Sequence, residues 1–372
     1  MYVESISFSK EYFENNKWKI DNFDFSKINL IAGKNASGKT RILNSISILI
    51  DFLRDGKIEN DSSIYNWNIK LLESETEYIY DLKIDNSIVL FEELKIDGTL
   101  YFSRNKSGKG QIKYDSQDSK LDFEIENNKI LLATKRDKIQ HKLLEPIFNW
   151  ISSFYLFKFG DSLGQALGYD IKNKIFTYND KQVVYKFREG LKEFKEPFKN
   201  KIIETFNSIG YDIEDIYTAD IAYQVYALYI KENGKEIYQR EISQGMFRAL
   251  SLIIQITYLD FTVEDNITIL IDDIGEGLDF ERADSLIRYL IKNAEKQKDK
   301  MQLIMTTNDR LVMNNVPLDY WIIVDKDDNG KINFYSEKSH RKNFENFEDI
   351  GLNNFDFFSS SFLTNFKSTL SS

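Results

Sequence analysis

The chain has no cysteine and only two histidines, His141 and His340, among 372 residues. Without cysteine it can form neither a disulfide framework nor a thiolate metal site, which fits a reducing compartment. Two histidines far apart in the sequence exclude a histidine-rich metal site. We therefore expect each histidine to be an ordinary packing or surface residue.

Long hydrophobic runs are missing as well. The longest apolar stretches, 42–53 and 250–259, are interrupted by polar residues and fall short of the roughly 18 residues that span a bilayer. The first residues, MYVESISFSK, lack the pattern of a signal peptide. We expect a cytoplasmic protein with no membrane contact. The net charge of −10 argues against a broadly basic surface for nucleic acid, although a local basic groove is compatible with it.

Hydrophobic residues make up 42% of the chain, enough for a sizeable core in one large or two medium domains. Apolar and polar residues alternate in runs separated by turn sequences, which predicts an antiparallel sheet with strands at 78–84, 88–96, 99–103, 111–114 and 121–126. From 135 to about 207 the spacing becomes helical, over 139–151 and 183–206. Asn233-Gly234 then marks a hairpin.

The most informative stretch is GKNASGKT, residues 33–40. An apolar strand is expected at 27–32 before it, and apolar residues at helical spacing follow at 41–53. Strand, glycine loop and helix together are typical of a phosphate site. The alternative is a glycine-rich turn before a helix, which the flanking strand and helix make less favourable.

The residue types in this stretch suit a polyphosphate. Gly33 and Gly38 let the backbone fold closely around it, so that N–H groups and the start of the helix point at the same oxygens. Lys39 would reach the β- and γ-phosphates, and the Thr40 hydroxyl would ligate Mg²⁺. The predicted nucleotide site also includes the neighbouring residues of the stretch, Asn35, Ala36, Ser37 and Arg41.

A second site is expected where ISQGMFRALSL begins a buried helix over 246–259. Ser243 and the bare amide of Gly245 would form an anion site at the start of that helix. A helix-capping serine also occurs without any function, so the segment gains weight only from its position before the next motif.

That motif is the apolar strand ILIDD, followed by GEGLD. A strand that ends in an acid puts a carboxylate at the carboxyl end of a sheet, where ligands bind in open α/β folds. Asp272 would hold the magnesium, and Asp273 could orient or deprotonate the attacking water. Another buried strand at 302–306 precedes Asn308.

In this order, GKNASGKT, ISQGMFRALSL, ILIDD with GLD, and MTTND resemble the motif set of ABC-type ATPases. The likeness is greatest to the RecF/SMC/OLD-like branch of stand-alone bacterial ATPases, many of them from phage-defence systems. The resemblance implies an α/β fold of P-loop NTPase type, an ABC ATPase head with an antiparallel β subdomain and an inserted helical lobe. The implied parts are a nucleotide-binding lobe at 1–134 and 266–345, a helical lobe with the signature motif at 135–265, and an aromatic tail at 346–372.

The resemblance also implies that two chains form a homodimer that sandwiches two ATP molecules. Lys39 and Thr40 of one subunit would face Ser243 and Gly245 of the other. The remaining roles carried over by the motifs are those of the metal-ligand acid, the catalytic glutamate, the acid of the loop that crosses the dimer interface and the switch histidine, at Asp272, Asp273, Asp279 and Asn308.

The chain departs from that family at three points, the first being a signature that reads SQG where transporters have SGG, which still leaves a helix-capping serine and a glycine amide. Asp273 is one methylene shorter than glutamate, and Asn308 cannot act as a proton-bearing imidazole. We therefore expect slow hydrolysis, with Glu276 as a second candidate base. Either Gln111 or Gln140 could be the glutamine of the loop that links the lobes.

The sequence favours an ATP-dependent conformational switch that controls a separately encoded effector protein, with anti-phage defence as its setting. One alternative is a RecF-like DNA-repair protein, supported by the basic segments 104–113 and 135–142. The other is an ATP-binding scaffold that does not hydrolyse ATP.

Overall fold

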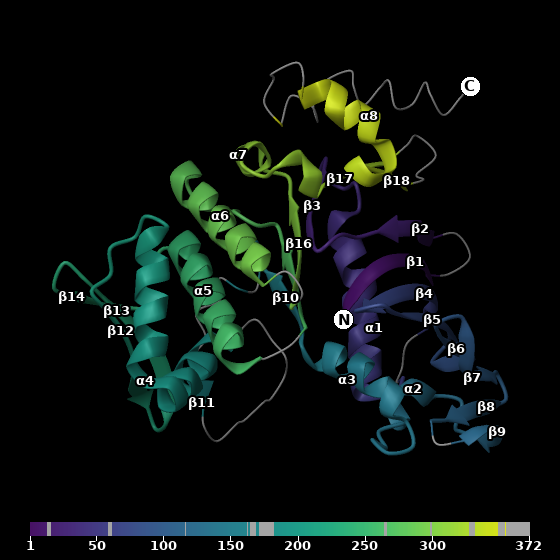
Figure 1. Ribbon diagram of the computed structural model, residues 1–372. Helices are drawn as coiled ribbons and strands as arrows, with labels where there is room; N and C mark the ends of the chain where they lie inside the picture. Colours follow the sequence, from purple (N-terminus) through teal and green to yellow (C-terminus); the bar gives the residue numbers. More distant parts are fainter. Residues whose placement is uncertain are drawn as a thin grey trace.

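The structure is a computed structural model, which describes residues 1–354 except 13–15, 59–61, 116, 162, 164–168, 171–181, 264–265, 298–299, 327–331 and 349–353. Its strands form three sheets, which together with their helices make up the successive layers in Figure 1. Most of the predicted aromatic tail lies outside the described residues.

A six-stranded sheet occupies the centre of the molecule, in the order β10-β15-β16-β3-β17-β18. All neighbouring strands are parallel except β17 and β18. Every residue of β3, β15 and β16 is buried, because layers cover both faces, and their sequences are accordingly near-continuous apolar runs. The strands are β3 (Ile28–Gly33), β10 (Phe154–Lys158), β15 (Ile267–Asp272), β16 (Met301–Thr307), β17 (Trp321–Lys326) and β18 (Ile332–Ser336).

An eight-stranded antiparallel sheet lies to one side, in the order β2-β1-β4-β5-β6-β7-β8-β9. Its strands alternate between buried and more exposed residues, as the period-two pattern predicts. The strands are β1 (Tyr2–Tyr12), β2 (Asn16–Asp24), β4 (Ile64–Glu73), β5 (Thr76–Asp85), β6 (Ile88–Ile96), β7 (Thr99–Asn105), β8 (Lys109–Tyr114) and β9 (Gln117–Glu124).

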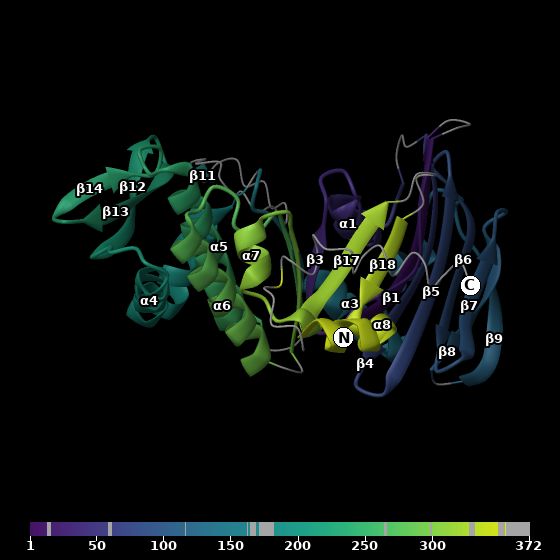
Figure 2. The ribbon, with the colours of Figure 1, turned by 90° about the horizontal axis from the view of Figure 1, so that it is seen from above.

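Helix α1 (Lys39–Asp55) lies between these two sheets (Figure 2). Its apolar residues join one hydrophobic cluster with the antiparallel sheet and one face of the central sheet. Trp67 of β4 donates a hydrogen bond from Nε1 to the carbonyl of Ser45 at 2.8 Å. The other face of the central sheet packs against α5 (Gln244–Thr262) and α6 (Phe280–Lys296), which belong to a second cluster. The central sheet thus lies between α1 on one face and α5 and α6 on the other.

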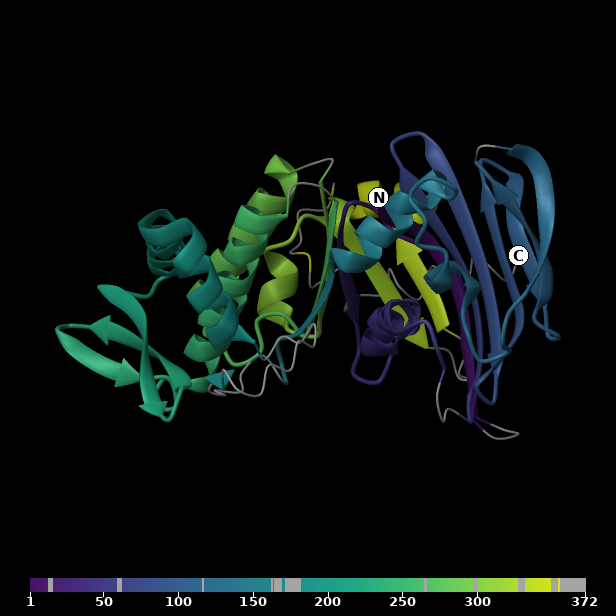
Figure 3. The same cartoon turned by 90° about the horizontal axis from the view of Figure 1, so that it is seen from below.

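A smaller lobe, which is only part of the predicted helical lobe 135–265, lies beyond α5 on the far side from the antiparallel sheet (Figure 3). It contains α4 (Val183–Ser208) and a small sheet in which β13 (Val225–Glu232) pairs with three other strands. The predicted hairpin at Asn233-Gly234 joins β13 to β14. The other strands of this sheet are β11 (Tyr169–Asp170), β12 (Asp215–Ala222) and β14 (Lys235–Tyr238).

The prediction of helix from 135 to 207 is wrong in its first half. Residues 139–141 lie outside any helix, and the helix expected over 139–151 is reduced to η2 (Lys142–Leu144) and α3 (Glu145–Ser152). Residues 154–158 form β10, an edge strand of the central sheet. A short apolar run cannot be assigned to strand or helix by periodicity alone, because both bury it. Strands β4 and β12 were also missed.

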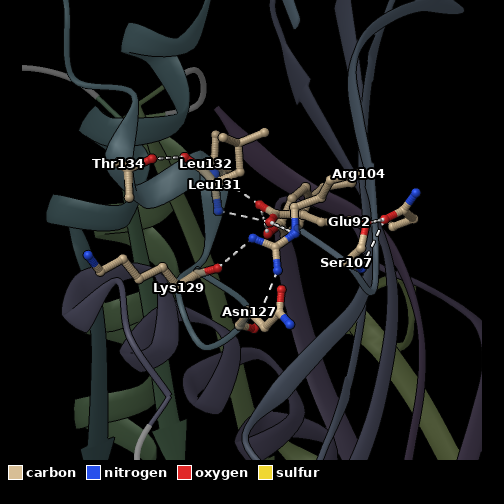
Figure 4. Close-up of polar contacts among 10 residues, drawn as sticks. Glu92, Arg104, Ser107, Asn127, Lys129, Leu131, Leu132 and Thr134 are labelled. Atoms are coloured by element: carbon tan, nitrogen blue, oxygen red, sulfur yellow. Dashed lines mark hydrogen bonds and ion pairs between the residues drawn. The ribbon is translucent and has the colours of Figure 1, made fainter. Parts of the chain in front are cut away.

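The chain leaves the antiparallel sheet through α2 (Leu131–Thr134), and a buried polar cluster holds this exit in place (Figure 4). Glu92 of β6 accepts hydrogen bonds from the backbone N–H groups of Leu131 and Leu132 at 2.8 and 2.9 Å. It also accepts one from the Tyr80 hydroxyl at 3.0 Å. Arg104 of β7 faces the Glu92 carboxylate at 3.8 Å. We call Tyr80, Glu92, Arg104, Leu131 and Leu132 the Glu92 cluster.

The remaining described elements are α7 (Arg310–Asn314), η4 (Leu318–Tyr320) and α8 (Glu337–Glu348). Beyond α8, the Asn354 side chain donates a hydrogen bond to the carbonyl of Val316 at 2.8 Å. Within the described residues, no helix is both long and apolar enough to cross a bilayer.

Candidate nucleotide-binding site

The loop between β3 and α1 has a backbone that requires small residues. A Cβ on Gly33 would lie 2.6 Å from the Ser37 hydroxyl oxygen and 2.7 Å from the carbonyl oxygen of Val324. Gly38 has φ 108° and Ala36 has φ 63°, both in the left-handed region. No side chain caps the first turn of α1, for which Gly38 is the N-cap residue. The N–H groups at this helix start are therefore available to an anion.

Lys39 is buried beneath this loop and has only neutral partners. Its ammonium donates hydrogen bonds to the carbonyls of Gly33 at 2.8 Å and Lys34 at 3.1 Å. Burial lowers the pKa of Lys39, and the nearby charges of Asp273 and Asp272 act in the opposite direction. The Ser37 hydroxyl is also buried and has no hydrogen-bond partner. Both side chains fit a site that an anionic group would complete.

The acid at the end of β15 meets the first turn of α1. Asp272 accepts hydrogen bonds at Oδ1 from the Thr40 hydroxyl at 3.1 Å and from the Thr306 hydroxyl at 2.6 Å. Thr306 in turn accepts one from the backbone N–H of Asp273 at 2.9 Å. The fold thus brings together two motifs separated by 232 residues. The sequence interpretation missed Thr306, although a polar residue at the end of a buried strand was a usable signal.

Thr40 and Asp272 offer a hydroxyl and a carboxylate, the oxygen donors that Mg²⁺ prefers. The described residues contain no group of three or more acidic, histidine or cysteine side chains able to hold a metal. This donor set fits Mg²⁺, which is usually held by one or two carboxylates, water and substrate phosphates.

Asp273 and Glu276 lie in the turn that follows β15. Asp273 is half-buried and has φ 53°. Burial raises the pKa of Asp273, as does the charge of Asp272, while Lys39 acts against them. Glu276 is exposed, and its Oε2 would lie 2.3 Å from a Cβ on Gly160. Two carboxylates therefore stand next to the acid at the end of β15.

Asn308 follows β16 and reaches across to the glycine loop. Its side-chain amide donates a hydrogen bond from Nδ2 to Oδ1 of Asn35 at 2.7 Å. Both residues are exposed. The fold thus brings two more of the predicted residues into contact.

The signature segment contacts other parts of the chain. Ser243 caps α5 by accepting a hydrogen bond from the Met246 N–H at 3.4 Å. Asp279 caps α6 and pairs with Arg282. A Cβ on Gly245 would lie 2.1 Å from the Gly277 carbonyl oxygen. In the described part of the chain, no hydrogen bond or ion pair connects these three predicted residues with 33–41.

A cavity of about 250 Å³ adjoins the loop between β1, β2 and α1. Arg41, predicted as a nucleotide contact, lies on its wall. Trp18 lies next to the loop, since a Cβ on Gly38 would lie 3.5 Å from its indole nitrogen. The sequence interpretation missed Trp18, because only strand pairing places β2 here. The cavity is lined by Phe8, Lys10, Trp18, Arg41, Asn44, Ser45 and Ile48.

Neither glutamine proposed for the loop between the lobes contacts this site in the described residues. Gln111 lies on β8 and donates a hydrogen bond to Asp122 on the antiparallel sheet at 2.9 Å. The backbone carbonyl of Gln140 accepts a hydrogen bond from Asp115 near the end of β8. Both proposals are therefore unsupported by the structure.

The chain is similar to proteins of known class. The family model described as "AAA domain, putative AbiEii toxin, Type IV TA system" matches residues 28–314. Among solved structures, an Smc head bound to the C-winged helix domain of ScpA has a TM-score of 0.53 at 16% identity, with coverage of 92% of this chain and 100% of that chain. An Smc head with an extended coiled coil, bound to the C-terminal domain of ScpA derived from Pyrococcus furiosus, has a TM-score of 0.47 at 15% identity, with coverage of 93% and 99%. No curated protein matches the sequence.

Proposed function

Because the chain belongs to the AAA-domain family of that description and has the fold of an ABC-like P-loop ATPase, we propose that it is an ATP-driven conformational switch. In this proposal ATP and Mg²⁺ close two copies into a homodimer, and slow hydrolysis opens it. The observation that carries the proposal is the meeting of Thr40 and Asp272 beside the buried Lys39. Such a meeting of hydroxyl, carboxylate and ammonium is what a Mg²⁺-triphosphate requires.

The glycine loop would bind the phosphates through its backbone N–H groups, with Lys39 as the cation. Thr40 and Asp272 would hold Mg²⁺, which supplies charge neutralisation between the phosphate oxygens when bound. Arg41 and the Trp18 indole would contact the base in the adjoining cavity. An aromatic face is a suitable partner because every base offers a π-face for stacking.

Asp273 and Glu276 are the proposed residues for orienting the attacking water and accepting its proton. The raised pKa of Asp273 brings this carboxyl nearer to the range in which a general base is effective. Asn308 would sense the conformation of the glycine loop, because its side chain is hydrogen-bonded to Asn35 of that loop. The short side chain of Asp273 and the absence of an imidazole at position 308 support slow turnover.

Ser243, Gly245 and Asp279 are proposed to act on the nucleotide of the second copy. This part of the proposal is supported by their position at the starts of α5 and α6, where helix dipoles favour negative charge. The effector is proposed as a separate protein, and anti-phage defence, through the OLD-like resemblance of the motifs, is proposed as the setting. The Smc head in the solved structure is likewise bound to a protein partner.

Steady-state phosphate release and sedimentation with Mg²⁺-ATP test the proposal together. We expect slow phosphate release that is lost in Asp273→Asn or Glu276→Gln, with Glu281→Gln on the exposed start of α6 as the matched control. We also expect ATP to shift the protein from monomer to dimer. Dimers without phosphate release would favour the scaffold alternative. Salt-sensitive DNA binding that needs ATP would favour the RecF-like alternative.

A further inference from the structure

An arginine of α5 that none of the predicted motif roles uses is buried behind the acidic turn. Arg248 is only 6% exposed. Its guanidinium donates one hydrogen bond to the carbonyl of Glu276 and another to the carbonyl of Gly160, both at 2.9 Å. Its Nε is buried without a hydrogen-bond partner, and no carboxylate forms an ion pair with it among the described residues. A charge buried among neutral acceptors is costly, so this placement calls for an explanation.

The three segments that meet at Arg248 approach one another closely at glycines. A Cβ on Gly245 would lie 2.1 Å from the carbonyl oxygen of Gly277, and one on Gly160 would lie 2.3 Å from Oε2 of Glu276. A Cβ on Gly277 would lie 3.0 Å from Arg248 itself. Gly245 in particular leaves no room for a side chain between the start of α5 and the turn after β15. The Arg248 side chain bonds to both the turn after β10 and the turn after β15.

We propose that Arg248 is a positioning residue that holds the acidic turn, with Asp273 and Glu276, in a fixed relation to the start of α5, with Ser243 and Gly245. This inference rests on the proposed function, because it concerns the hydrolysis of ATP at that site. When the ATP of a second copy engages the start of α5, Arg248 transmits the displacement to the carbonyl of Glu276. Engagement of the second copy and placement of the proposed base are thereby coupled.

The chemistry requires arginine at this position. Two carbonyls on separate turns need two donors held at a fixed separation, which the planar guanidinium provides. The single ammonium of lysine is a compact charge on a flexible stem and cannot reproduce this fork. Arg248→Lys therefore keeps the charge and removes the bridge, which separates positioning from electrostatics.

The test compares the kcat and the ATP dissociation constant of Arg248→Lys with those of wild type. We expect kcat to fall on the order of 10- to 100-fold, because small displacements of reacting groups have effects of this size. The ATP dissociation constant should stay within about threefold, since Arg248 does not contact the glycine loop. Arg288→Lys, an exposed arginine of α6 bonded to Asp284, is the matched control. An unchanged kcat, or a loss of ATP affinity in proportion to kcat, would overturn the proposal.

Amide hydrogen exchange supplies a readout that does not depend on turnover. We expect faster exchange at residues 274–278 in Arg248→Lys, with exchange along α6 unchanged. If wild type hydrolyses no ATP, the proposed function fails, while unchanged exchange at 274–278 would count against Arg248 alone. Should Arg248→Lys not fold, Arg248→Gln, which removes the buried charge and the fork of donors together, must give a loss in kcat with ATP affinity retained.

Discussion

Two buried clusters of charged residues in this chain differ in the hydrogen-bond and ion-pair partners that their charges have. In the Glu92 cluster, the carboxylate accepts three hydrogen bonds from its own chain and faces the guanidinium of Arg104. At the glycine loop, Lys39 has only two carbonyls, and Ser37 has no partner. The charges of the first cluster face each other within the chain, whereas, among the described residues, the ammonium of Lys39 faces no carboxylate within hydrogen-bond distance and the Ser37 hydroxyl has no partner.

Burial alone does not separate the two clusters. It raises the pKa of Glu92 and lowers the pKa of both Arg104 and Lys39. The distinguishing feature is the set of partners, because Glu92 and Arg104 face each other, whereas Lys39 faces only carbonyls at a helix start whose N–H groups are uncapped. Removing a group from the Glu92 cluster should therefore lower stability, whereas removing one beside the glycine loop should lower nucleotide binding.

The largest effect is expected from Glu92→Gln. This change leaves Arg104 buried without an opposite charge, which costs about 3–5 kcal/mol of unfolding free energy. ATP affinity should not change at temperatures where the protein is folded. Urea denaturation measures the loss, and Glu93→Gln, whose partner is the more exposed Lys95, should cost less than about 1 kcal/mol. Equal losses in the two variants would erase the distinction between the clusters.

Asp272→Asn should do the opposite of Glu92→Gln: it should weaken ATP binding without lowering stability. Removing the proposed Mg²⁺ ligand lowers ATP affinity at least about tenfold, or roughly 1.4 kcal/mol, and only when Mg²⁺ is present. The unfolding free energy should hold or rise, because the amide can still accept the hydrogen bonds from Thr40 and Thr306. Titration of ATP in the presence of Mg²⁺ and in the presence of a chelator measures the affinity under both conditions. An affinity loss that is the same in both would remove Asp272 from the metal site.

Trp18→Ala probes the cavity beside the loop and should have a smaller effect. Loss of base stacking is expected to weaken ATP by about 1 kcal/mol, roughly fivefold. Inorganic triphosphate should bind the variant as it binds wild type, because it has no base. Equal weakening of both ligands would show that Trp18 supports the loop instead of the base.

The smallest effect is expected in the pH dependence of Asp273. Its raised pKa means that, between 3.8 and the folded-state pKa, the native state holds more protons than the unfolded state. Stability therefore falls as pH rises through this window, and the cost of the buried charge is full above it. Without nucleotide, Asp273→Asn should gain more unfolding free energy over wild type at pH 8 than at pH 4. A gain that does not vary with pH would contradict the burial of this charge.

The sequence predicted those elements whose pattern is local. Consecutive residues encode the middle strands β16 and β3, the glycine loop and the start of α1. The predicted fold class is confirmed. Strand β10 was missed because five mostly apolar residues suit a buried helix as well as a buried strand. Its place became visible only through pairing with β15.

The candidate site shows the same limit. Lys39, Thr40 and Asp272 could be proposed from motifs, because each stands at a fixed position relative to a glycine or a strand end. Trp18 and Arg248 could not, since their roles depend on contacts between segments distant in sequence, and Thr306 offered only the signal of a polar residue at the end of a buried strand. The fold determines which groups surround a buried charge, and a single sequence carries little information about these groups.

Calorimetric titration of Mg²⁺-ATP into wild type, Lys39→Ala and Lys34→Ala tests the central claim most directly. Lys34 is the exposed neighbour of Lys39 in the same loop, so the pair separates a buried phosphate contact from general positive charge. We predict saturable binding to wild type and Lys34→Ala, and a loss of at least about 100-fold, or roughly 2.8 kcal/mol, in Lys39→Ala. Equal binding by Lys39→Ala, or no binding by wild type, would contradict the account.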